Sequence, residues 1–439
     1  MWDPSQVVDF IVSAGENRYS TLGVLASIKF LYLTPEKLCN ALKEENVLNV
    51  LKNMLGKLYE RKQLLRLVVD EAQCATTGGV DFRKDYGNLS LFRNCFPSVP
   101  VVALSGTACD QTRRDIMATL HLRNPFVSVR PCIRENLKIS LTPKKSNEDA
   151  FKLMTVSLKD DFPNQCGIIY CIKKADCEKL STFLVKEGYS ATFYHDVRFV
   201  FHLSMPKSIE SYYQECGRAG HDGQLAFCIM FYKFSDYFDQ QSLIYYDPLG
   251  NKVAEIQTAE LVNLKKVVTF CENRTVCRNV GISSFLDEIP RPCDVNSLAI
   301  CDISESQDRY DEVDVIQHVR DVRDTIMTNF STRFTTSFLV NIFLAKQLDK
   351  KRALYTGDVK DCAMYGKGAD WNADNAYRFI QKMILDNVLE ECLVCEPPRP
   401  AYAIIRIGSN WPLEKYSFLM VQAESTEQSN RPKNNFRAE

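Results

Sequence analysis

Two adjacent carboxylates follow an apolar run early in the chain. Asp70 and Glu71 come directly after residues 64–69 (LLRLVV), and Gln73 stands two positions later. Open α/β sheets bind ligands at the carboxyl ends of their strands, so these side chains are well placed for chemistry. In ATP-driven motors the first carboxylate of such a pair holds Mg²⁺ and the second orients the attacking water. The same residues are equally compatible with an acidic turn after a strand.

Two later segments also place polar side chains after apolar runs. Residues 105–108 (SGTA) carry hydroxyls, among them Thr107, that could sense a nucleotide or could simply form a turn. Residues 212–223 (YYQECGRAGHDG) contain Gln214 and Arg218, spaced by small residues as in a loop that reaches a phosphate from a neighbouring domain. The three segments occur in order, and this joint occurrence is more specific than any one of them.

Short apolar runs rich in β-branched residues alternate with helix-length stretches through the first half of the chain. The alternation predicts parallel sheets covered by helices, and therefore an α/β fold. Polar residues near 130–150, which include Pro143, predict a boundary between two such units. The expected strands are residues 64–69, 99–104, 167–170, 197–201 and 226–232, and two of the expected helices are residues 110–121 and 174–187.

The sequence changes character after about residue 255. Residues 265–304 are rich in cysteine, and the acidic, polar residues 304–314 predict a linker. A third compact unit and a frayed polar tail are expected to follow. These parts are residues 315–417, with helices at 336–346 and 372–389 and a hairpin near 397–400, and residues 424–439.

The composition limits the classes of protein to which the chain could belong. Its 439 residues are 45% hydrophobic and 25% charged, which predicts an ordinary globular protein of roughly two to four domains. The formal net charge of −1 excludes a polycation, so a nucleic-acid surface must be a local patch. No secretory signal or membrane span is visible, so the 17 cysteines are expected to be free thiols or metal ligands in the cytosol or nucleus.

The ordered segments resemble those of the RecQ family of superfamily 2 helicases. The resemblance implies two incomplete RecA-like motor domains, a helical zinc-binding subdomain and a winged-helix domain. It also implies ATP-driven 3′→5′ unwinding of DNA in recombination, repair and replication, and therefore a nuclear location. The expected partner is single-stranded and branched or duplex DNA, and the residues do not identify which genome-maintenance proteins could bind. The implied domains are residues 1–130, 131–254, 255–304 and 315–417, and the matching segments include 31–37, 70–74, 81–86, 167–171 and 196–210.

The resemblance assigns roles to individual residues of the nucleotide site. Asp70 would hold the Mg²⁺ that accompanies ATP, Glu71 would position water, and Arg218 would stabilise the transition state. The implied catalytic residues are Asp70, Glu71, Gln73, Gln214 and Arg218, and the nucleotide-binding residues are Asp70, Thr107 and Arg218.

Three cysteines match the family's zinc-binding subdomain. Cys277, Cys293 and Cys301 would supply three of the four thiolates that hold a structural Zn²⁺. The fourth position falls at Ser304, and serine is a poor zinc ligand. Cys271 is a possible substitute, but six residues before Cys277 on a helix it faces the other way. The alternative is three unligated thiols in a collapsed subdomain.

The resemblance also implies contacts with DNA. Family members use helix starts and nearby Lys or Thr side chains to grip duplex phosphates. The hairpin at residues 393–408 corresponds to the strand-separating wing, although its proline-rich tip is equally compatible with a plain surface turn. The candidate DNA-binding residues are Arg83, Thr335, Lys367, Lys382, Pro398 and Arg399.

The chain departs from the family pattern at several places. No G-x-x-x-x-G-K-[ST] phosphate loop occurs in it, and the chain is expected to begin after the position of that loop. A gap between His195 and Asp196 would remove a helix and a central strand, which would expose apolar edges unless the second sheet rearranges. Residues 75–80 lack the family's tryptophan, and His221 replaces the second arginine of its motif.

Two hypotheses follow from these observations. In the first, the chain represents an ATP-hydrolysing DNA helicase of the RecQ type. In the second, it is a catalytically inactive binding module in which residues 315–417 grip DNA and the motor remnant serves as a scaffold. The missing phosphate loop makes the second hypothesis physically attractive for the chain as written, so whether the chain is an enzyme stays open.

Overall fold

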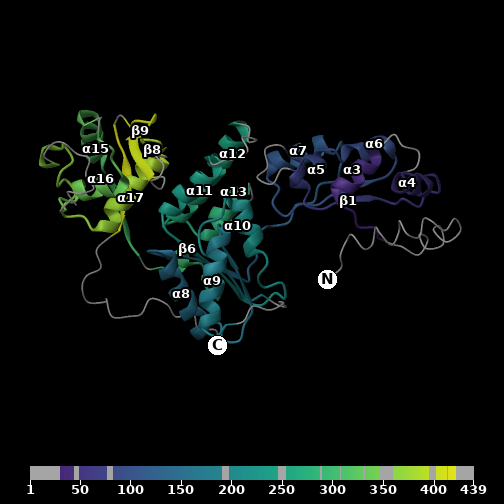
Figure 1. Ribbon diagram of the computed structural model, residues 1–439, viewed down its shortest axis with the longest axis horizontal. Helices are drawn as coiled ribbons and strands as arrows, with labels where there is room; N and C mark the ends of the chain where they lie inside the picture. The colour runs from purple at the N-terminus through teal and green to yellow at the C-terminus, as the bar shows by residue number, and fades with distance from the viewer. Residues whose placement is uncertain are drawn as a thin grey trace. The chain divides into compact units, whose positions relative to one another are not determined.

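In the computed structural model, helices alternate with strands and the largest sheet is parallel, which confirms the predicted α/β class (Figure 1). The structure describes residues 30–43, 49–76, 83–189, 197–245, 254–286, 289–306, 308–329, 332–346, 359–394, 402–412 and 414–421. The chain forms two compact units, Met1–Arg134 with Ile282–Arg291 and Glu135–Gly281 with Pro292–Glu439. No helix in these described ranges is both long enough and apolar enough to cross a bilayer.

The first unit is built around a small parallel sheet. β1 (Leu67–Val69) pairs with β2 (Val101–Ala103), with Leu67 opposite Val101. Short helices enclose a core that includes Cys39, Phe92 and Ile116, all buried. These helices are α3 (Pro35–Lys43), α4 (Val50–Glu60), the 3-10 helix η1 (Ala72–Ala75), α5 (Lys84–Gly87), α6 (Ser90–Cys95) and α7 (Asp110–Thr119).

Both strands of the first unit are shorter than the apolar runs that predicted them. Leu65 and Leu104, at the ends of those runs, are 70% and 48% exposed. Hydrophobicity marks a candidate strand, but only residues that face a partner strand form the ladder. Pairing therefore covers Leu67–Val69 and Val101–Ala103 alone.

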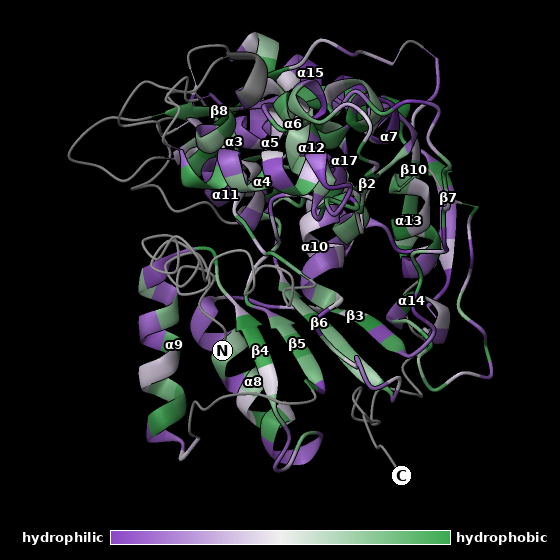
Figure 2. Ribbon diagram, turned by 90° about the vertical axis from the view of Figure 1, so that its right-hand side faces the viewer, coloured by the Kyte–Doolittle hydropathy of each residue, from purple (hydrophilic) through white to green (hydrophobic). Residues whose placement is uncertain are grey.

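The second unit contains a four-stranded parallel sheet in the order β3-β6-β5-β4, whose strands lie side by side in Figure 2. The predicted strands at 167–170 and 226–232 are confirmed, and every residue of the latter is buried. The strands are β3 (Leu137–Pro143), β4 (Gly167–Tyr170), β5 (Phe199–His202) and β6 (Ala226–Tyr232). The helices that accompany them are α8 (Asn147–Asp160), α9 (Lys174–Lys186), α10 (Ile209–Cys216), α11 (Ser235–Tyr245), α12 (Ala254–Glu272) and α14 (Asp302–Glu305). α13 (Arg278–Phe285) begins in this unit, and its residues from Ile282 onward are grouped with the first unit.

The boundary predicted near residues 130–150 agrees with the division of the chain between Arg134 and Glu135, but the range also contains a strand that was not expected. β3 occupies its middle, and the first four strand residues are buried. Lys138 and Ser140 interrupt the apolar pattern, yet Lys138 is buried because it pairs with Glu305 at 2.8 Å. Pro143 ends the strand opposite Tyr232.

β5 follows the position of the gap expected at residues 195/196, and it has neighbours on both edges. Phe199 pairs with Gly167 of β4 on one side and with Phe227 of β6 on the other. Val200 and Phe201 are fully buried. Apolar edges were expected to be exposed unless the sheet rearranges, and β5 is an interior strand of the sheet. His195 and Asp196 themselves lie outside the described residues.

The C-terminal part of the second unit has a core of its own, in which the rings of Phe343, Trp371, Phe379 and Phe418 contact one another. Two antiparallel strand pairs flank three helices. The elements are β7 (Tyr310–Asp314) paired with β10 (Ser417–Val421), α15 (Ile316–Thr328), α16 (Thr336–Phe343), the 3-10 helix η2 (Val359–Asp361), α17 (Ala373–Leu385), and β8 (Leu389–Val394) paired with β9 (Tyr402–Ile407).

Three expectations for this C-terminal part need correction. The helix predicted at 372–389 ends at Leu385, and Leu389 begins β8. The linker predicted at residues 304–314 contains β7, because the backbone of Tyr310–Asp314 pairs with β10 and Val313 packs against the core despite its acidic neighbours. The helix predicted at 336–346 ends at Phe343, before Ala345 adopts a left-handed φ of 51°.

Candidate functional site

The paired carboxylates lie where the sequence predicted, directly after β1. Asp70 and Glu71 are exposed, and the Glu71 N–H donates to Asp70 Oδ1 at 3.0 Å. Glu71 adopts φ 50° and ψ 44°, a left-handed conformation that is rare outside glycine. The Ala72 N–H donates to Leu104 O at 2.9 Å and fastens this turn to the end of β2. Such strained backbone is held in place by its surroundings and is often found at functional sites.

Gln73 joins the carboxylate turn to the loop after β2. Its Nε2 donates to Glu71 Oε2 at 2.5 Å, and its Oε1 accepts from Ser105 Oγ at 2.6 Å. Ser105 Oγ in turn accepts the N–H of buried Thr107 at 3.3 Å. The structure thus brings Glu71, Gln73 and Thr107 together through Ser105, the other hydroxyl of the predicted segment 105–108.

Gln214 and Arg218 belong to the second unit, at the end of α10 and just after it. Gln214 is half-buried and Arg218 is exposed. Arg218 forms a side-chain hydrogen bond with Tyr170 at the end of β4. Burial raises the pKa of the Tyr170 hydroxyl, while the nearby guanidinium lowers it in part. The arginine therefore lies near the carboxyl end of this sheet, where α/β folds bind ligands.

His202 is a residue of this region that sequence reasoning missed. It ends β5, is 1% exposed, and places Nε2 2.9 Å from Glu215 Oε2. Its ring stacks on that of Tyr170 with centroids 5.3 Å apart. The signal in the sequence was a histidine directly after the apolar run Phe199–Phe201.

The loop after Arg218 is anchored to neighbouring strands. Arg198 donates to Leu225 O at 2.9 Å and to Asp222 Oδ2 at 2.6 Å, and its hydrogen bond lowers the pKa of Asp222. Gly220 has a φ of 59°, and its carbonyl accepts from Asn136 Nδ2 at 2.9 Å. These bonds fix the backbone that carries Arg218.

Cys277, Cys293 and Cys301 gather in the second unit, with their sulfur atoms within 4.8 Å of one another. Cys277 Sγ lies 3.4 Å from Cys293 Sγ and 3.8 Å from Cys301 Sγ. Thiolates bound to one tetrahedral Zn²⁺ at about 2.3 Å would be separated by about 3.8 Å, so the three sulfurs fit this ion. Hydrogen bonds with Cys293 and Cys301 hold the pKa of Cys277 well below its usual range.

Ser304 lies beside this cluster, and Cys271 does not. Ser304 Oγ lies 3.2 Å from Cys301 Sγ. Cys271 is fully buried elsewhere, with its Sγ 3.6 Å from Met230 Sδ, and burial raises the pKa of its thiol.

A bidentate salt bridge between Arg278 and Asp302 connects the cysteine cluster to β3. Arg278 Nε lies 2.9 Å from Asp302 Oδ1 and its Nη2 lies 3.0 Å from Oδ2, and each residue directly follows a cysteine of the cluster. Asp302 Oδ2 also accepts the N–H of Leu141 at 3.1 Å. The cluster is therefore tied to the outer strand of the sheet.

The predicted DNA-binding residues have unequal surroundings. The Thr335 hydroxyl caps α16 by accepting the Phe338 N–H at 3.3 Å, and Lys382 pairs with Asp386 at 2.8 Å. Lys367 and Arg83 are exposed. Pro398 and Arg399 lie outside the described residues, so the hairpin tip stays a prediction.

Gly366 and Gly368 hold the loop that carries Lys367. Gly366 has a φ of 68°, and its N–H donates to Ile342 O at 3.0 Å. A side chain at Gly368 would overlap the ring of Phe343. Lys367 is thus presented between two backbone positions that suit glycine alone.

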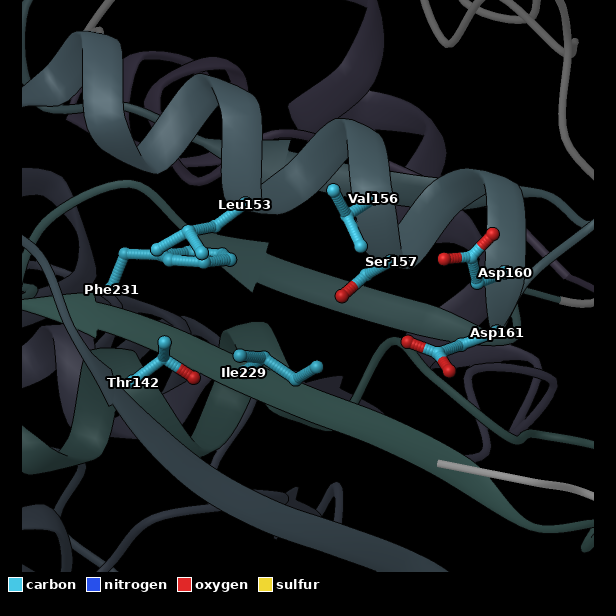
Figure 3. Close-up of a pocket in the computed structure, with 8 residues that line it drawn as sticks. All are labelled: Thr142, Leu153, Val156, Ser157, Asp160, Asp161, Ile229 and Phe231. Atoms are coloured by element: carbon cyan, nitrogen blue, oxygen red, sulfur yellow. The ribbon is translucent and has the colours of Figure 1, made fainter. Parts of the chain in front are cut away.

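A small pocket in the second unit lies between α8 and strands β3 and β6 (Figure 3). Apolar side chains such as Leu153 and Phe231 line one end, and Asp160 and Asp161 lie at the other. Burial raises the pKa of Asp161. The pocket has no basic side chain and contains none of the predicted site residues, so it suits neither a phosphate nor the predicted chemistry.

The C-terminal part of the chain matches a known domain family. Residues 309–424 match the RQC domain family. This range begins at β7, which agrees with the inclusion of that strand in the C-terminal core.

Several curated proteins are similar to most of the chain. It is 32% identical over 91% of its length to the RecQ-like DNA helicase BLM of Xenopus laevis, of which it covers 32%. It is 31% identical over 90% of its length to the RecQ-like DNA helicase blm-1 of Caenorhabditis elegans, of which it covers 43%. The chain thus spans well under half the length of these relatives. A solved structure of Saccharomyces cerevisiae Dbp5 bound to RNA and ADP BeF3 matches 49% of this chain and 68% of its own, with a TM-score of 0.33 and 16% identity.

Proposed function

The chain belongs to the RecQ family of helicases, and from that premise we propose that it forms the ATP-dependent 3′→5′ DNA-unwinding part of a nuclear genome-maintenance helicase. The observation that carries this proposal is the hydrogen-bonded set of Glu71, Gln73 and Ser105 at the carboxyl end of the first sheet. It joins the two loops that a RecQ-type motor would use to sense nucleotide.

Each predicted residue takes a role in this proposal. Asp70, an exposed oxygen donor at a strand end, would hold the Mg²⁺ that accompanies ATP, since Mg²⁺ prefers carboxylates and phosphate oxygens. Glu71 would orient the attacking water, with Gln73 fixing its carboxylate. Arg218 would stabilise the charge that develops on the transferred phosphoryl group. Gln214 would assist from the same segment, and Thr107 would hold the loop after β2.

The same proposal gives the domains their identities. Residues 1–130 and 131–254 would be RecA-like, residues 255–304 a zinc-binding subdomain, and residues 315–417 a winged helix. Arg83, Thr335, Lys367 and Lys382, with Pro398 and Arg399 of the hairpin, would contact single-stranded and branched or duplex DNA. A structural Zn²⁺ would be held by Cys277, Cys293 and Cys301, and it would stabilise the fold of this subdomain.

DNA-stimulated ATP hydrolysis by the purified chain tests the proposal directly. Glu71→Gln should abolish hydrolysis and 3′→5′ unwinding while leaving DNA affinity unchanged, because the amide cannot activate water. Glu60→Gln, an exposed substitution on α4 of the same unit, is the matched control and should have no effect. Equal rates in the wild type and Glu71→Gln would reject the assigned role.

A second function is DNA binding without hydrolysis. One observation favours it: residues 309–424 match the RQC domain. In that case salt-dependent DNA binding should survive Asp70→Asn and Glu71→Gln. Lys367→Ala should weaken it similarly for all sequences, because phosphate contacts carry no base information. No DNA affinity in the wild type would reject this function.

A further inference from the structure

We propose that the zinc site of this chain has three thiolate ligands, Cys277, Cys293 and Cys301, and that the hydroxyl of Ser304 occupies its fourth position in exchange with solvent. The inference rests on the zinc-binding subdomain of the proposed function and concerns how this chain departs from a closed four-thiolate site. Structural zinc sites are closed by four strong ligands, whereas sites with three protein ligands keep an exchangeable position.

The surroundings of Cys277 and Cys301 suit thiolates. The Cys293 N–H points at Cys277 Sγ at 3.3 Å, and the N–H groups of Arg278 and Ser304 point at Cys301 Sγ, each at 3.4 Å. Backbone donors of this kind stabilise negative sulfur and orient metal ligands. Zinc binding would release the protons that remain on the three thiols, since only the thiolate is a ligand.

The position of Ser304 follows from the start of α14. Cys301 is the cap residue of this helix, and Ser304 stands three positions later, where the chain turns back toward it. The Ser304 Oγ to Cys301 Sγ distance of 3.2 Å is close to the roughly 3.5 Å expected between an oxygen and a sulfur ligand of one tetrahedral zinc. A neutral hydroxyl is a weaker ligand than a thiolate, so this position is the one that opens to solvent.

Other nearby donors are engaged elsewhere. Asp302 is held by Arg278 and by the Leu141 N–H. Glu305 pairs with Lys138. Cys271 lies against Met230, and no further His, Cys, Asp or Glu of the described ranges joins the cluster.

Cobalt substitution in the full chain tests the ligand set, because each bound thiolate adds charge-transfer absorption in the near ultraviolet. Wild type should bind one Co²⁺ with about three quarters of the absorption of Ser304→Cys, a nearly isosteric change. Competition with a chromophoric chelator should give Ser304→Cys a higher zinc affinity than wild type, because a thiolate is a stronger zinc ligand than a hydroxyl. Ser304→Ala should keep the wild-type absorption, with water in place of the hydroxyl.

Two controls make the result decisive. Cys95→Ser, which removes an exposed thiol of the first unit, should leave absorption and affinity unchanged. Cys271→Ala should do the same, and a loss of absorption there would overturn the proposal by identifying a fourth thiolate. Equal absorption in wild type and Ser304→Cys, or no binding of stoichiometric metal by a folded wild type, would also overturn it. None of these readouts depends on ATP hydrolysis, so failure here is distinguishable from failure of the proposed motor function.

Discussion

Arg278 and Asp302 form a two-point ion pair between the segments that carry Cys277 and Cys301. Arg278 is 1% exposed and also donates to Phe270 O at 2.6 Å, so its guanidinium is fully enclosed by partners. Because Asp302 also holds the backbone of β3, one carboxylate connects the cysteine cluster to the outer strand of the sheet.

We expect Asp302→Asn to destabilise the second unit by about 3–5 kcal/mol, because it leaves a buried guanidinium without its counter-charge. Urea unfolding of the full chain, followed by circular dichroism, measures the change. Asp294→Asn, an exposed substitution in the same segment, should change the free energy of unfolding by less than about 0.5 kcal/mol. A change just as small for Asp302→Asn would contradict the importance of the pair.

Gly167→Ala should destabilise the junction between β4 and β5. A Cβ at Gly167 would overlap the ring of Phe199, which is 4% exposed and packed against Phe162 and Phe201 with centroids 4.8 and 4.6 Å away. Since the ring has no room to move, we expect a cost of about 1–3 kcal/mol.

A double-mutant cycle checks that explanation. In a Phe199→Leu background the space of the ring is empty. There, Gly167→Ala should cost at least about 1 kcal/mol less free energy of unfolding than in the wild type, a coupling energy typical of residues in contact. Equal costs in the two backgrounds would show that Gly167 does not face Phe199, and so would argue against the direct pairing of β4 with β5.

The stability of the C-terminal core should depend on Glu391. Burial raises the pKa of this carboxyl on β8 to about 7 from its ordinary value of 4.5. Between pH 4.5 and pH 7 the Glu391 carboxyl is therefore protonated in the folded chain and ionised in the unfolded chain. The stability that comes from the protonated carboxyl is present at low pH and is lost as pH rises through 7.

We expect Glu391→Gln to remove that pH dependence, worth roughly 1–3 kcal/mol between pH 5 and pH 8. Tryptophan fluorescence during denaturant unfolding reports on the event, because Trp371 and Trp411 pack against this core. Glu390→Gln, its exposed neighbour, is the matched control. A pH profile that is the same in Glu391→Gln as in wild type would count against a buried, protonated carboxyl.

Gln73→Ala should lower DNA-stimulated ATP hydrolysis on the order of 10–100-fold, because Glu71 would lose the partner that fixes its carboxylate. Ser105→Ala should have a smaller effect in the same direction, since it frees one end of Gln73. Ser98→Ala, which removes a hydroxyl bonded to Tyr59 elsewhere in the unit, is the control. Unchanged hydrolysis in Gln73→Ala would exclude a positioning role for this side chain.

Strands that are apolar throughout could be predicted from the sequence, and strands stabilised by polar contacts could not. β6 was evident because every one of its side chains is buried. β3 was missed because Lys138 is buried only through Glu305, a residue far away in the sequence. β7 was missed because its acidic residues face solvent while its backbone pairs with β10.

In the candidate site, too, some features could be predicted from the sequence and others could not. The positions of Asp70 and Glu71 after a strand followed from the sequence, because parallel strands end at one edge of a sheet. The bond from Gln73 to Ser105 did not, because it depends on the left-handed turn at Glu71. The gathering of three cysteines was expected from the resemblance to the RecQ family, whereas the ion pair of Arg278 with Asp302 depends on how two loops meet.

The direct pairing of β4 with β5 has a consequence for the order of folding. Gly167 and its partner Phe199 are separated in the sequence by a short crossover that contains α9. Leu137 and its partner Ala226 are separated by a much longer stretch of chain. Loop-closure entropy grows with the length of chain between partners, so the β4–α9–β5 segment should fold first. Pulsed hydrogen exchange should protect the amides of β5 before those of β3, and simultaneous protection would contradict this order. During synthesis, this segment can form its strand pair on the ribosome before β6 has emerged.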